Sequence, residues 1–316
     1  MTTAQKVDPL LERAIVSLNR IVADTWRIGR LVSQGTFGIV YELASETRTD
    51  RQLAIKVGKR RMEGARCSDI EWEAYVLRYQ EGNVHCPKMY GFQAGDKNVE
   101  YIIMDLLGQS LSMIHKRHGY APLETGKAAN IGNQCIEALR SLHATGFIHR
   151  DIKPGNVALG LNDRSNVIHI IDFGLARRIR YKDGSLFPPR SRVGFCGTLH
   201  YASRRALANK DQSMADDLES LFYMLCELVC GKLPWPKAIS QKEALLYKQA
   251  SYCNGIVLPS GARWLRSFGE HVLPLQYFDE PKYHLLQKVC VEKMQEEILN
   301  GSDALALNPM FGSNDQ

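Results

Sequence analysis

Hydrophobic and polar residues alternate along much of the first third of the chain. The segments IGRLVSQGTFGIVYELAS (28–45) and QLAIKVG (52–58) mix β-branched with polar positions, and turn-forming ETRTD (46–50) lies between them. This alternation predicts β-strands that are joined by a turn. A further strand is predicted for VEYIIMDLLG, which ends at Gly108. Together these strands indicate a small β-rich region.

One helix is predicted inside this β-rich region. In SDIEWEAYVLRYQ (68–80) the apolar residues recur at helical spacing. Ser68 and Glu71 have the pattern of a capping box, which marks the beginning of a helix.

Helical periodicity dominates after Gly108. TGKAANIGNQCIEALRSLHATG (125–146) places its apolar residues on one face and ends at a glycine. SMADDLESLFYMLCELVCGKLPW (213–235) begins with a capping-box pattern and has apolar residues around most of its circumference, which indicates a buried helix. Two short apolar strands, NVALG (156–160) and NVIHIIDFG (166–174), lie between these helices.

These patterns predict an α+β fold of two lobes with a cleft between them. The N-lobe is small and β-rich with one main helix, and the C-lobe is larger and mostly helical. We expect an N-terminal extension (1–25), the N-lobe with a hinge (26–107), the C-lobe (108–300) and a C-terminal tail (301–316). The N-terminal extension either docks on a lobe or stays mobile.

The composition agrees with this organisation. The chain has 316 residues, of which 45% are hydrophobic, and its formal net charge is +6. That size supports a sizeable core in one large domain or two lobes. The slight basic excess is either a solubility feature or a surface that attracts phosphate or acidic peptides. No basic motif interleaved with aromatic residues is present, so we expect no nucleic-acid binding.

The cysteines and the N-terminus predict an intracellular protein. Eight cysteines are scattered without a C-x-x-C pair or a histidine at zinc-like spacing, so we expect reduced thiols. The first twenty residues, MTTAQKVDPLLERAIVSLNR, are charged and lack the apolar core of a signal peptide. No apolar run is long enough to cross a membrane. We expect a monomer in the cytoplasm, with the nucleus as a second compartment.

A glycine-containing hairpin is the first candidate for phosphate binding. VSQGTFGIVYE contains Gly35 and Gly38, and Ser33 stands where a glycine-rich phosphate loop would have its first glycine. Glycines let backbone amides approach a phosphate closely. Two glycines in a hairpin are also an ordinary tight turn, so this motif by itself decides nothing.

A lysine in the next predicted strand is the second candidate. Lys56 lies within LAIKVG, and its ammonium points to the opposite face from its two apolar neighbours. Such a lysine is either solvated or paired with a carboxylate. The predicted helix offers two glutamates, and because Glu71 belongs to the capping box, we assign Glu73 as the partner.

The octapeptide HRDIKPGN, which begins at His149, holds an acid, a base and an amide close together. Asp151 can orient or accept a hydroxyl proton, Lys153 can stabilise charge on a migrating phosphoryl group, and Asn156 can ligate Mg²⁺. Sixteen residues later, Asp172 of DFG offers a hard oxygen ligand to the same ion. We interpret His149 as a core histidine that holds the loop, without a role in proton transfer.

The glycine loop, strand lysine, helix glutamate, H-R-D-x-K-x-x-N and D-F-G occur in an order that resembles the eukaryotic protein kinases over residues 26–295. The resemblance implies a two-lobed protein kinase fold with ATP and Mg²⁺ in the cleft. Lys153, two residues after Asp151, is similar to the class that phosphorylates Ser and Thr of protein substrates. The implied catalytic residues are Lys56, Glu73, Asp151, Lys153 and Asn156, and the implied metal ligands are Asn156 and Asp172. The implied ATP-binding residues are Val32, Ser33, Gly35, Gly38, Val40, Ala54, Lys56, Met104, Asp105 and Leu107.

The helical part carries features of one kinase group. The usual A-P-E is missing, and GTLHYAS (197–203) is similar to the G-T-x-R-Y-A-S of the casein kinase I group. MDLLGQSL resembles the hinge of that group, with Met104 as gatekeeper. The resemblance also implies that Asp217 anchors the catalytic loop and that Thr198 shapes the peptide-binding floor. PPRSRVGFCGT (188–198) looks closest to the tau-tubulin kinase branch.

Two residues depart from the family pattern. Ser33 replaces a loop glycine, and His200 replaces the arginine of G-T-x-R-Y, which helps casein kinases to hold an anion such as a priming phosphate. A neutral imidazole cannot grip an anion as a guanidinium does. We therefore expect an enzyme that depends little on pre-phosphorylated substrate.

The segment between DFG and GTLHYAS is basic, with five arginines at 177, 178, 180, 190 and 192. These charges form either a solvated face or an attraction for acidic substrates. Tyr181, Ser185 and Ser191 are candidate phosphorylation sites, and Arg150 would either read such a phosphate or anchor the loop. The casein kinase resemblance implies instead that the segment is active without that switch.

Three rival functions remain to be weighed against an active protein kinase. A pseudokinase that acts as a binding scaffold usually lacks the lysine, the base or a metal ligand, and this chain retains all of them. D-F-G and GTLHYAS argue against a small-molecule kinase. Only the basic pI of 8.8 suggests a nucleic-acid binder.

Overall fold

The computed structural model describes residues 26–35, 38–45, 52–59, 69–93, 99–235, 240–252 and 258–307. The predicted extension at 1–25 and Ser68 of the first predicted capping box lie outside these residues. The chain divides into two compact units. Unit 1 reaches Gly82 and includes Pro87–Leu107 and Asp172–Gly174. Unit 2 consists of Asn83–Cys86, Gly108–Ile171 and the chain from Leu175 onward.

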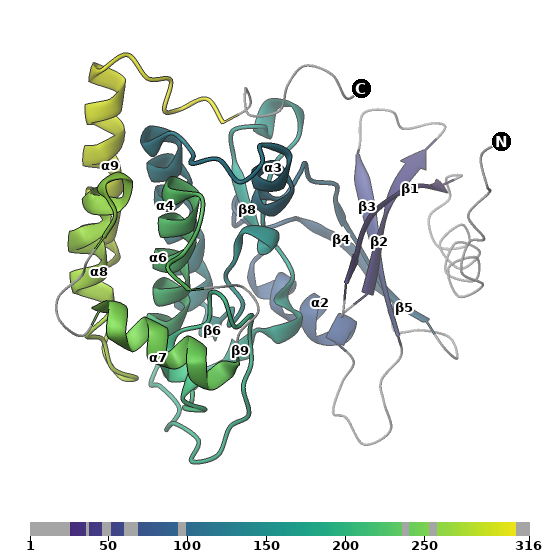
Figure 1. The fold of residues 1–316 in the computed structure, drawn as a ribbon. Coiled ribbons are helices and arrows are strands. Elements are labelled where there is room, and N and C mark those ends of the chain that lie inside the picture. Colours follow the sequence, from purple (N-terminus) through teal and green to yellow (C-terminus); the bar gives the residue numbers. More distant parts are fainter. Residues whose placement is uncertain are drawn as a thin grey trace. The chain divides into compact units, whose positions relative to one another are not determined.

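Unit 1 is built on an antiparallel sheet of five strands with the order β1-β2-β3-β5-β4 (Figure 1). The predicted strands and the predicted helix are confirmed, except that the strand expected to end at Gly108 ends at Asp105. A core of apolar side chains from β2, β3 and β5 covers one face of the sheet, with Ile55 at its centre and fully buried. The elements are β1 (Trp26–Gly35), β2 (Gly38–Ser45), β3 (Leu53–Lys59), α2 (Asp69–Tyr79), β4 (Met89–Gln93) and β5 (Val99–Asp105).

Unit 2 is mostly helical, as predicted, and α4 packs against both α6 and α9 (Figure 1). Its α-helices are α3 (Leu111–Arg117), α4 (Thr125–Ala144), α5 (Arg204–Leu207), α6 (Met214–Cys230), α7 (Gln241–Tyr252), α8 (Arg266–Val272) and α9 (Tyr283–Leu299). Short 3₁₀ turns are formed by Pro154–Asn156, Asn162–Arg164 and Ser260–Leu265, and a further one spans Phe173–Leu175.

Helix α6 is the buried centre of unit 2. All its residues from Met214 to Val229 are buried. The predicted capping box begins the helix, since the Ser213 amide donates to the Asp216 carboxylate at 2.7 Å. Gly231 ends the helix in a left-handed conformation with a φ of 75°. The all-round apolar pattern therefore predicted its burial correctly.

Two small antiparallel ribbons complete unit 2. One pairs β6 (Phe147–Ile148) with β9 (Arg177–Arg178), and the other pairs β7 (Val157–Leu159) with β8 (Ile168–Ile170). The sequence HRDIKPGN (149–156) forms a loop that runs directly from β6 to β7. The two ribbons thus fix both ends of that loop.

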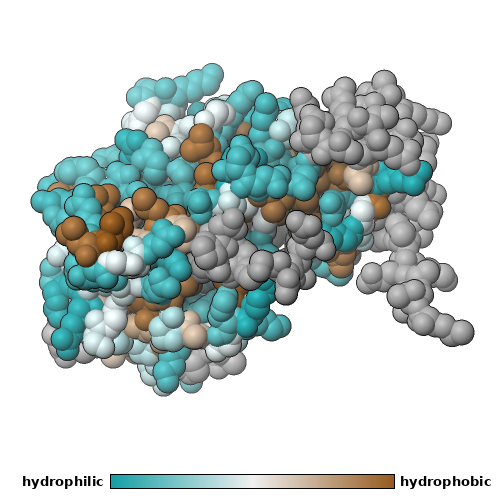
Figure 2. All heavy atoms as spheres, turned by 90° about the horizontal axis from the view of Figure 1, so that it is seen from above, coloured by the Kyte–Doolittle hydropathy of each residue, from teal (hydrophilic) through white to brown (hydrophobic). Residues whose placement is uncertain are grey.

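Hydrophilic residues cover much of the face drawn in Figure 2, and hydrophobic residues form smaller groups between them. Within the part of the chain that the structure describes, no helix has both the length and the apolar character of a membrane span.

Candidate functional site

In unit 1, Lys56 of β3 is buried against two carboxylates. Its Nζ donates to Glu73 Oε2 at 2.5 Å and to Asp172 Oδ1 at 2.9 Å. Burial alone lowers the pKa of Lys56, but the nearby carboxylates of Glu73 and Asp172 outweigh it and raise the pKa above its ordinary value. The ammonium therefore stays charged. Glu73 rather than the exposed Glu71 makes this contact.

The glycine hairpin lies at the ends of β1 and β2, where Gly35 pairs with Gly38. Gly38 has a φ of 148°, and an added Cβ would lie 2.5 Å from the carbonyl oxygen of Val57. Any larger residue would push the hairpin away from β3, so glycine is required here. Ser33, which replaces the first glycine of the family pattern, pairs with Val40 and is exposed.

The predicted adenine-binding positions follow β3 and β5. Ala54 is buried and pairs with Met104 across the two strands. The carboxylate of Asp105 accepts hydrogen bonds from the Lys88 amide at 3.0 Å and the Tyr90 hydroxyl at 2.9 Å. The Asp105 side chain therefore fixes the chain before β4, and only its backbone is available for a ligand.

In unit 2, Asp151 is the centre of a hydrogen-bonded group on the HRDIKPGN loop. Its Oδ1 accepts the Thr198 hydroxyl at 2.7 Å, and its Oδ2 accepts Lys153 Nζ at 2.6 Å and Asn156 Nδ2 at 3.1 Å. Lys153 Nζ also donates to Thr198 Oγ1 at 2.9 Å. Asp151 is only 6% exposed, so these donors stabilise its charge where water is scarce.

Asp217 holds the backbone of the same loop from α6. Its carboxylate accepts the amides of His149 at 2.7 Å and Arg150 at 2.8 Å. These bonds hold Arg150 at a φ of 70°, a conformation that non-glycine residues rarely adopt. Burial alone raises the pKa of Asp217, but hydrogen bonding from His143 outweighs it and lowers the pKa below its ordinary value. Asp217 is thus a carboxylate.

His149 itself is a core residue. Its ring is fully buried, Nε2 donates to the Ile171 carbonyl at 3.1 Å, and Nδ1 accepts the Asp151 amide at 3.3 Å. Arg150 donates from Nε to the Leu175 carbonyl at 2.7 Å. Of the two functions considered for Arg150, a loop anchor is the one this contact supports.

The GTLHYAS segment approaches the HRDIKPGN loop closely. Gly197 has a φ of 117°, and an added Cβ would lie 2.8 Å from the Arg150 carbonyl oxygen. His200, in the same segment, is buried, and its Nε2 lies 3.4 Å from the buried Glu227 carboxylate. Glu227 also accepts the Tyr201 hydroxyl. The imidazole therefore faces an internal carboxylate.

Most of the arginines between DFG and GTLHYAS bind carboxylates of unit 2. Their interpretation as a solvated face is therefore wrong. Arg177 and Arg190 both bind the Asp211 carboxylate, which is only 4% exposed. Arg180 binds Glu280 at 2.5 Å. Arg192 is exposed, and an attraction for acidic substrates stays a prediction.

Sequence reasoning missed the residues behind Asp217. His143 of α4 donates from Nε2 to Asp217 Oδ2, and its Nδ1 accepts the Tyr283 hydroxyl of α9. The one local signal was a histidine on the otherwise apolar face of the helix at 125–146. Tyr283 lies 140 residues further along the chain, and no local pattern relates the two.

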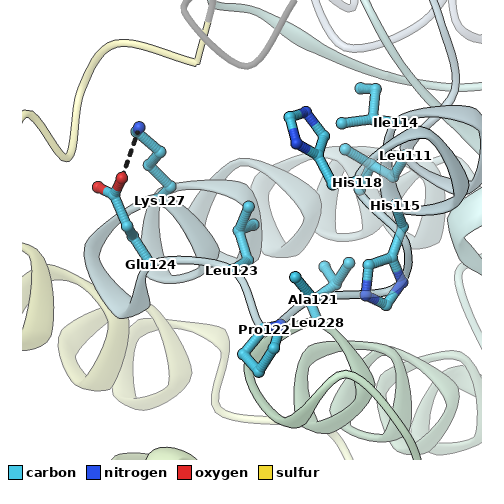
Figure 3. Close-up of a pocket in the computed structure, with 10 residues that line it drawn as sticks. All are labelled: Leu111, Ile114, His115, His118, Ala121, Pro122, Leu123, Glu124, Lys127 and Leu228. Atoms are coloured by element: carbon cyan, nitrogen blue, oxygen red, sulfur yellow. Dashed lines mark hydrogen bonds and ion pairs between the residues drawn. The ribbon is translucent and has the colours of Figure 1, made fainter.

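A separate pocket of about 260 Å³ lies in unit 2 between α3, the beginning of α4 and Leu228 of α6 (Figure 3). Its walls are mainly apolar, with His115 and His118 on one side and the Glu124–Lys127 ion pair of 3.1 Å on the other. None of the sequence-predicted site residues lines this pocket.

Comparison with known proteins decides the family. Residues 26–296 match the protein kinase domain. The chain belongs to the protein kinase family. The two-lobed protein kinase fold predicted from the sequence is thereby confirmed.

Two relatives agree with this kinase assignment. A Dictyostelium discoideum protein named as a probable serine/threonine-protein kinase is 32% identical over 275 residues, which are 84% of this chain and 53% of the relative. A Caenorhabditis elegans protein with a casein kinase I name is 31% identical over 231 residues, which are 72% of this chain and 67% of the relative. This kinase chain therefore spans about half the length of the Dictyostelium relative.

Proposed function

We propose that this kinase is an active serine/threonine protein kinase of the casein kinase I type, which transfers the γ-phosphoryl group of ATP to proteins. The observation that carries this proposal is the buried Asp151 carboxylate, held by Lys153, Thr198 and Asn156 on a loop that Asp217 anchors. A pseudokinase has no need for such a group. The name of the Dictyostelium relative supports the serine/threonine class, and the name of the Caenorhabditis relative supports the casein kinase I type.

On the acceptor side, Asp151 orients the substrate hydroxyl and receives its proton. A bond forms between the acceptor oxygen and the γ-phosphorus, while the bond from that phosphorus to the β–γ bridging oxygen breaks, so that ADP leaves. Lys153, whose Nζ lies 2.6 Å from Asp151 Oδ2, stabilises charge on the transferring group. Positioning and electrostatics provide most of the rate enhancement in such a reaction.

On the nucleotide side, Lys56 binds the α- and β-phosphates. Its ammonium is kept charged and oriented by Glu73 before any ligand arrives. Gly35 and Gly38 leave the β1–β2 hairpin without side chains at these positions, which allows backbone amides to approach the phosphates. The adenine packs against the apolar residues Val32, Val40, Ala54 and Met104 and bonds to the backbone of Asp105–Leu107.

The proposed metal ligands have the chemistry that Mg²⁺ requires. Asn156 uses its amide nitrogen to donate to Asp151, both to the carbonyl at 2.9 Å and to the carboxylate at 3.1 Å. Its amide oxygen takes part in neither bond and is a hard ligand of the type that Mg²⁺ prefers, and Asp172 would contribute a carboxylate. When bound, Mg²⁺ neutralises phosphate charge during transfer.

We further propose that the substrates are proteins with Ser or Thr acceptors, acidic but not pre-phosphorylated. The buried Glu227 carboxylate lies beside His200, where the casein kinase I pattern has an anion-binding arginine. A phosphate at this place would be poorly hydrated and would meet an acidic side chain instead of a guanidinium. Arg192 is exposed and can attract acidic side chains. The sequence PPRSRVGFCGT supports a place in the tau-tubulin kinase branch.

A transfer assay tests the proposal. The full chain is incubated with ATP and Mg²⁺ and with three peptides that differ only in having Ser, Thr or Tyr as acceptor. We expect phosphorylation of the Ser and Thr peptides that stops when EDTA removes the metal. A thermal shift with Mg²⁺ and ATP but no transfer to any peptide would instead establish the scaffold function of a pseudokinase.

A further inference from the structure

A buried lysine outside the proposed catalytic group lies in α7. Lys248 has no exposed surface. Its Nζ donates to the carbonyl oxygen of Ala202 at 2.5 Å and to that of Leu199 at 3.2 Å. The same ammonium lies over the rings of Tyr223, 4.5 Å from the centroid, and Trp235, 5.0 Å from the centroid. Two carbonyls and two aromatic faces therefore surround it.

This lysine has no ion pair with a carboxylate among the described residues. The negative charge of Glu219 acts electrostatically on Lys248, but the Glu219 oxygens bind Arg204 and the Tyr223 hydroxyl. Burial lowers the pKa of Lys248 to about 7. Burying a lysine without a carboxylate costs free energy, and a methionine or leucine would fill the same space. Charged or neutral, however, the amine keeps N–H donors for both carbonyls.

The two carbonyls belong to the segment that contacts the catalytic aspartate. Leu199 follows Thr198, whose hydroxyl donates to Asp151 at 2.7 Å. Between the two carbonyls, that of His200 accepts a hydrogen bond from Trp235 Nε1 at 2.9 Å. Side chains from outside the segment thus hold three of its carbonyls. The segment is not itself helical at these residues, because α5 begins only at Arg204, so no helical hydrogen bonds hold the three carbonyls.

We propose that Lys248 is a positioning residue that fixes Leu199–Ala202 in the conformation that receives the acceptor peptide. This inference rests on the proposed function, in which GTLHYAS forms the peptide-binding floor. Lys248 acts through backbone carbonyls and touches neither nucleotide nor phosphate. Its loss should therefore weaken peptide binding and leave ATP binding unchanged.

The test compares Lys248→Met with Lys242→Met. Both replace a lysine of α7, but Lys242 is exposed and serves as the matched control. Lys248→Met removes the two hydrogen bonds and leaves the carbonyls of Leu199 and Ala202 without these donors. This loss should raise the KM for an acceptor peptide about tenfold. The KM for ATP should change less than twofold, and Lys242→Met should behave as wild type. A variant with lower thermal stability but an unchanged peptide KM would show a merely structural lysine and overturn the proposal.

Lys248→Gln covers the case in which Lys248→Met does not fold. Its amide keeps N–H donors but has no charge and a shorter reach, so we expect a rise in peptide KM of a few-fold. A peptide KM equal to wild type in folded Lys248→Gln would contradict the proposal.

Thr198→Val separates this inference from the proposed function on which it rests. If Thr198→Val impairs peptide phosphorylation and neither Lys248 variant does, only the inference about Lys248 fails. If Thr198→Val also leaves peptide kinetics unchanged, the assignment of the peptide-binding floor fails as well.

Discussion

His143 Nε2 donates a hydrogen bond of 2.9 Å to Asp217 Oδ2, and this buried contact joins α4 to the carboxylate that anchors the HRDIKPGN loop. Tyr283 of α9 donates to the other ring nitrogen of His143 at 2.7 Å. Asp217 in turn accepts the amides of His149 and Arg150. Three helices therefore determine the position of two backbone amides next to Asp151.

This arrangement predicts a graded response to substitution. Asp217→Asn replaces an acceptor oxygen by an N–H donor that faces buried donors, and it should cost about 3 kcal/mol of unfolding free energy and at least tenfold in kcat. Tyr283→Phe removes only the outer hydroxyl and should cost about 1 kcal/mol with little effect on kcat. Urea unfolding and peptide phosphorylation measure both effects. Wild-type kcat in Asp217→Asn would contradict the anchoring role.

The proposed base and metal ligand can be separated by their effects. Asp151→Asn keeps the shape of the side chain but cannot take a proton, so kcat should fall roughly 10²-fold or more while ATP binding is retained. Asp172→Asn should reduce Mg²⁺-dependent activity more than it reduces ADP binding. Steady-state kinetics and nucleotide titrations measure these effects. Near-normal turnover of Asp151→Asn would refute its assignment, and a parallel loss of activity and ADP binding would remove the metal role of Asp172.

The environment of His200 predicts little benefit from a priming phosphate. Paired peptides that differ only in a phosphoserine near the acceptor should have similar kcat/KM values, because His200 lacks the guanidinium that would bind the phosphate and instead faces the acidic group of Glu227. Glu227→Gln should shift the ratio toward the primed peptide by removing that acidic group. A strong primed preference in the wild-type protein would be incompatible with this prediction.

The contacts of Asp211 predict that the segment between DFG and GTLHYAS is ordered without phosphorylation. The Asp211 carboxylate binds the side chains of Arg177 and Arg190 and the Arg190 amide at 2.9 Å, so it supplies the negative charge that a phosphate would otherwise provide. Phosphatase-treated protein should keep its activity. Asp211→Asn should lose activity and about 2 kcal/mol of unfolding free energy. An inactive phosphatase-treated protein would contradict the prediction.

Lys248 predicts a pH dependence of stability. Burial lowers its pKa from 10.5 to about 7, so between these values the unfolded chain binds a proton that the folded protein does not. The unfolding free energy should therefore rise with pH across this window, by up to about 1.4 kcal/mol per pH unit.

Urea unfolding of wild type and Lys248→Met at pH 7, 8 and 9 tests this dependence. The variant should lack the contribution of Lys248, so the difference between the two proteins should change with pH. Equal slopes would show that Lys248 has the same proton affinity in the folded and unfolded states.

The sequence by itself determined the local elements and the order of the motifs. The strand patterns located β1, β2, β3 and β5 of the sheet in unit 1 but missed the short β4. The all-round apolar pattern located α6, because such patterns record which faces of an element are buried. The choice of Glu73 over Glu71 as the partner of Lys56 also followed from local reasoning. Glu71 stands at the capping-box position of the predicted helix, which left Glu73 to pair with the lysine. The chemistry of HRDIKPGN and DFG is likewise carried by residues close together in sequence.

Only the tertiary structure decided how distant side chains meet. The contacts of Lys248 with Ala202, of Tyr283 with His143, and of Arg177 with Asp211 join residues 46, 140 and 34 positions apart. No periodicity records such contacts, because each depends on how helices and loops pack. A lysine in a helical sequence looks exposed, and a run of arginines looks solvated, until neighbouring elements remove the water and supply the partners.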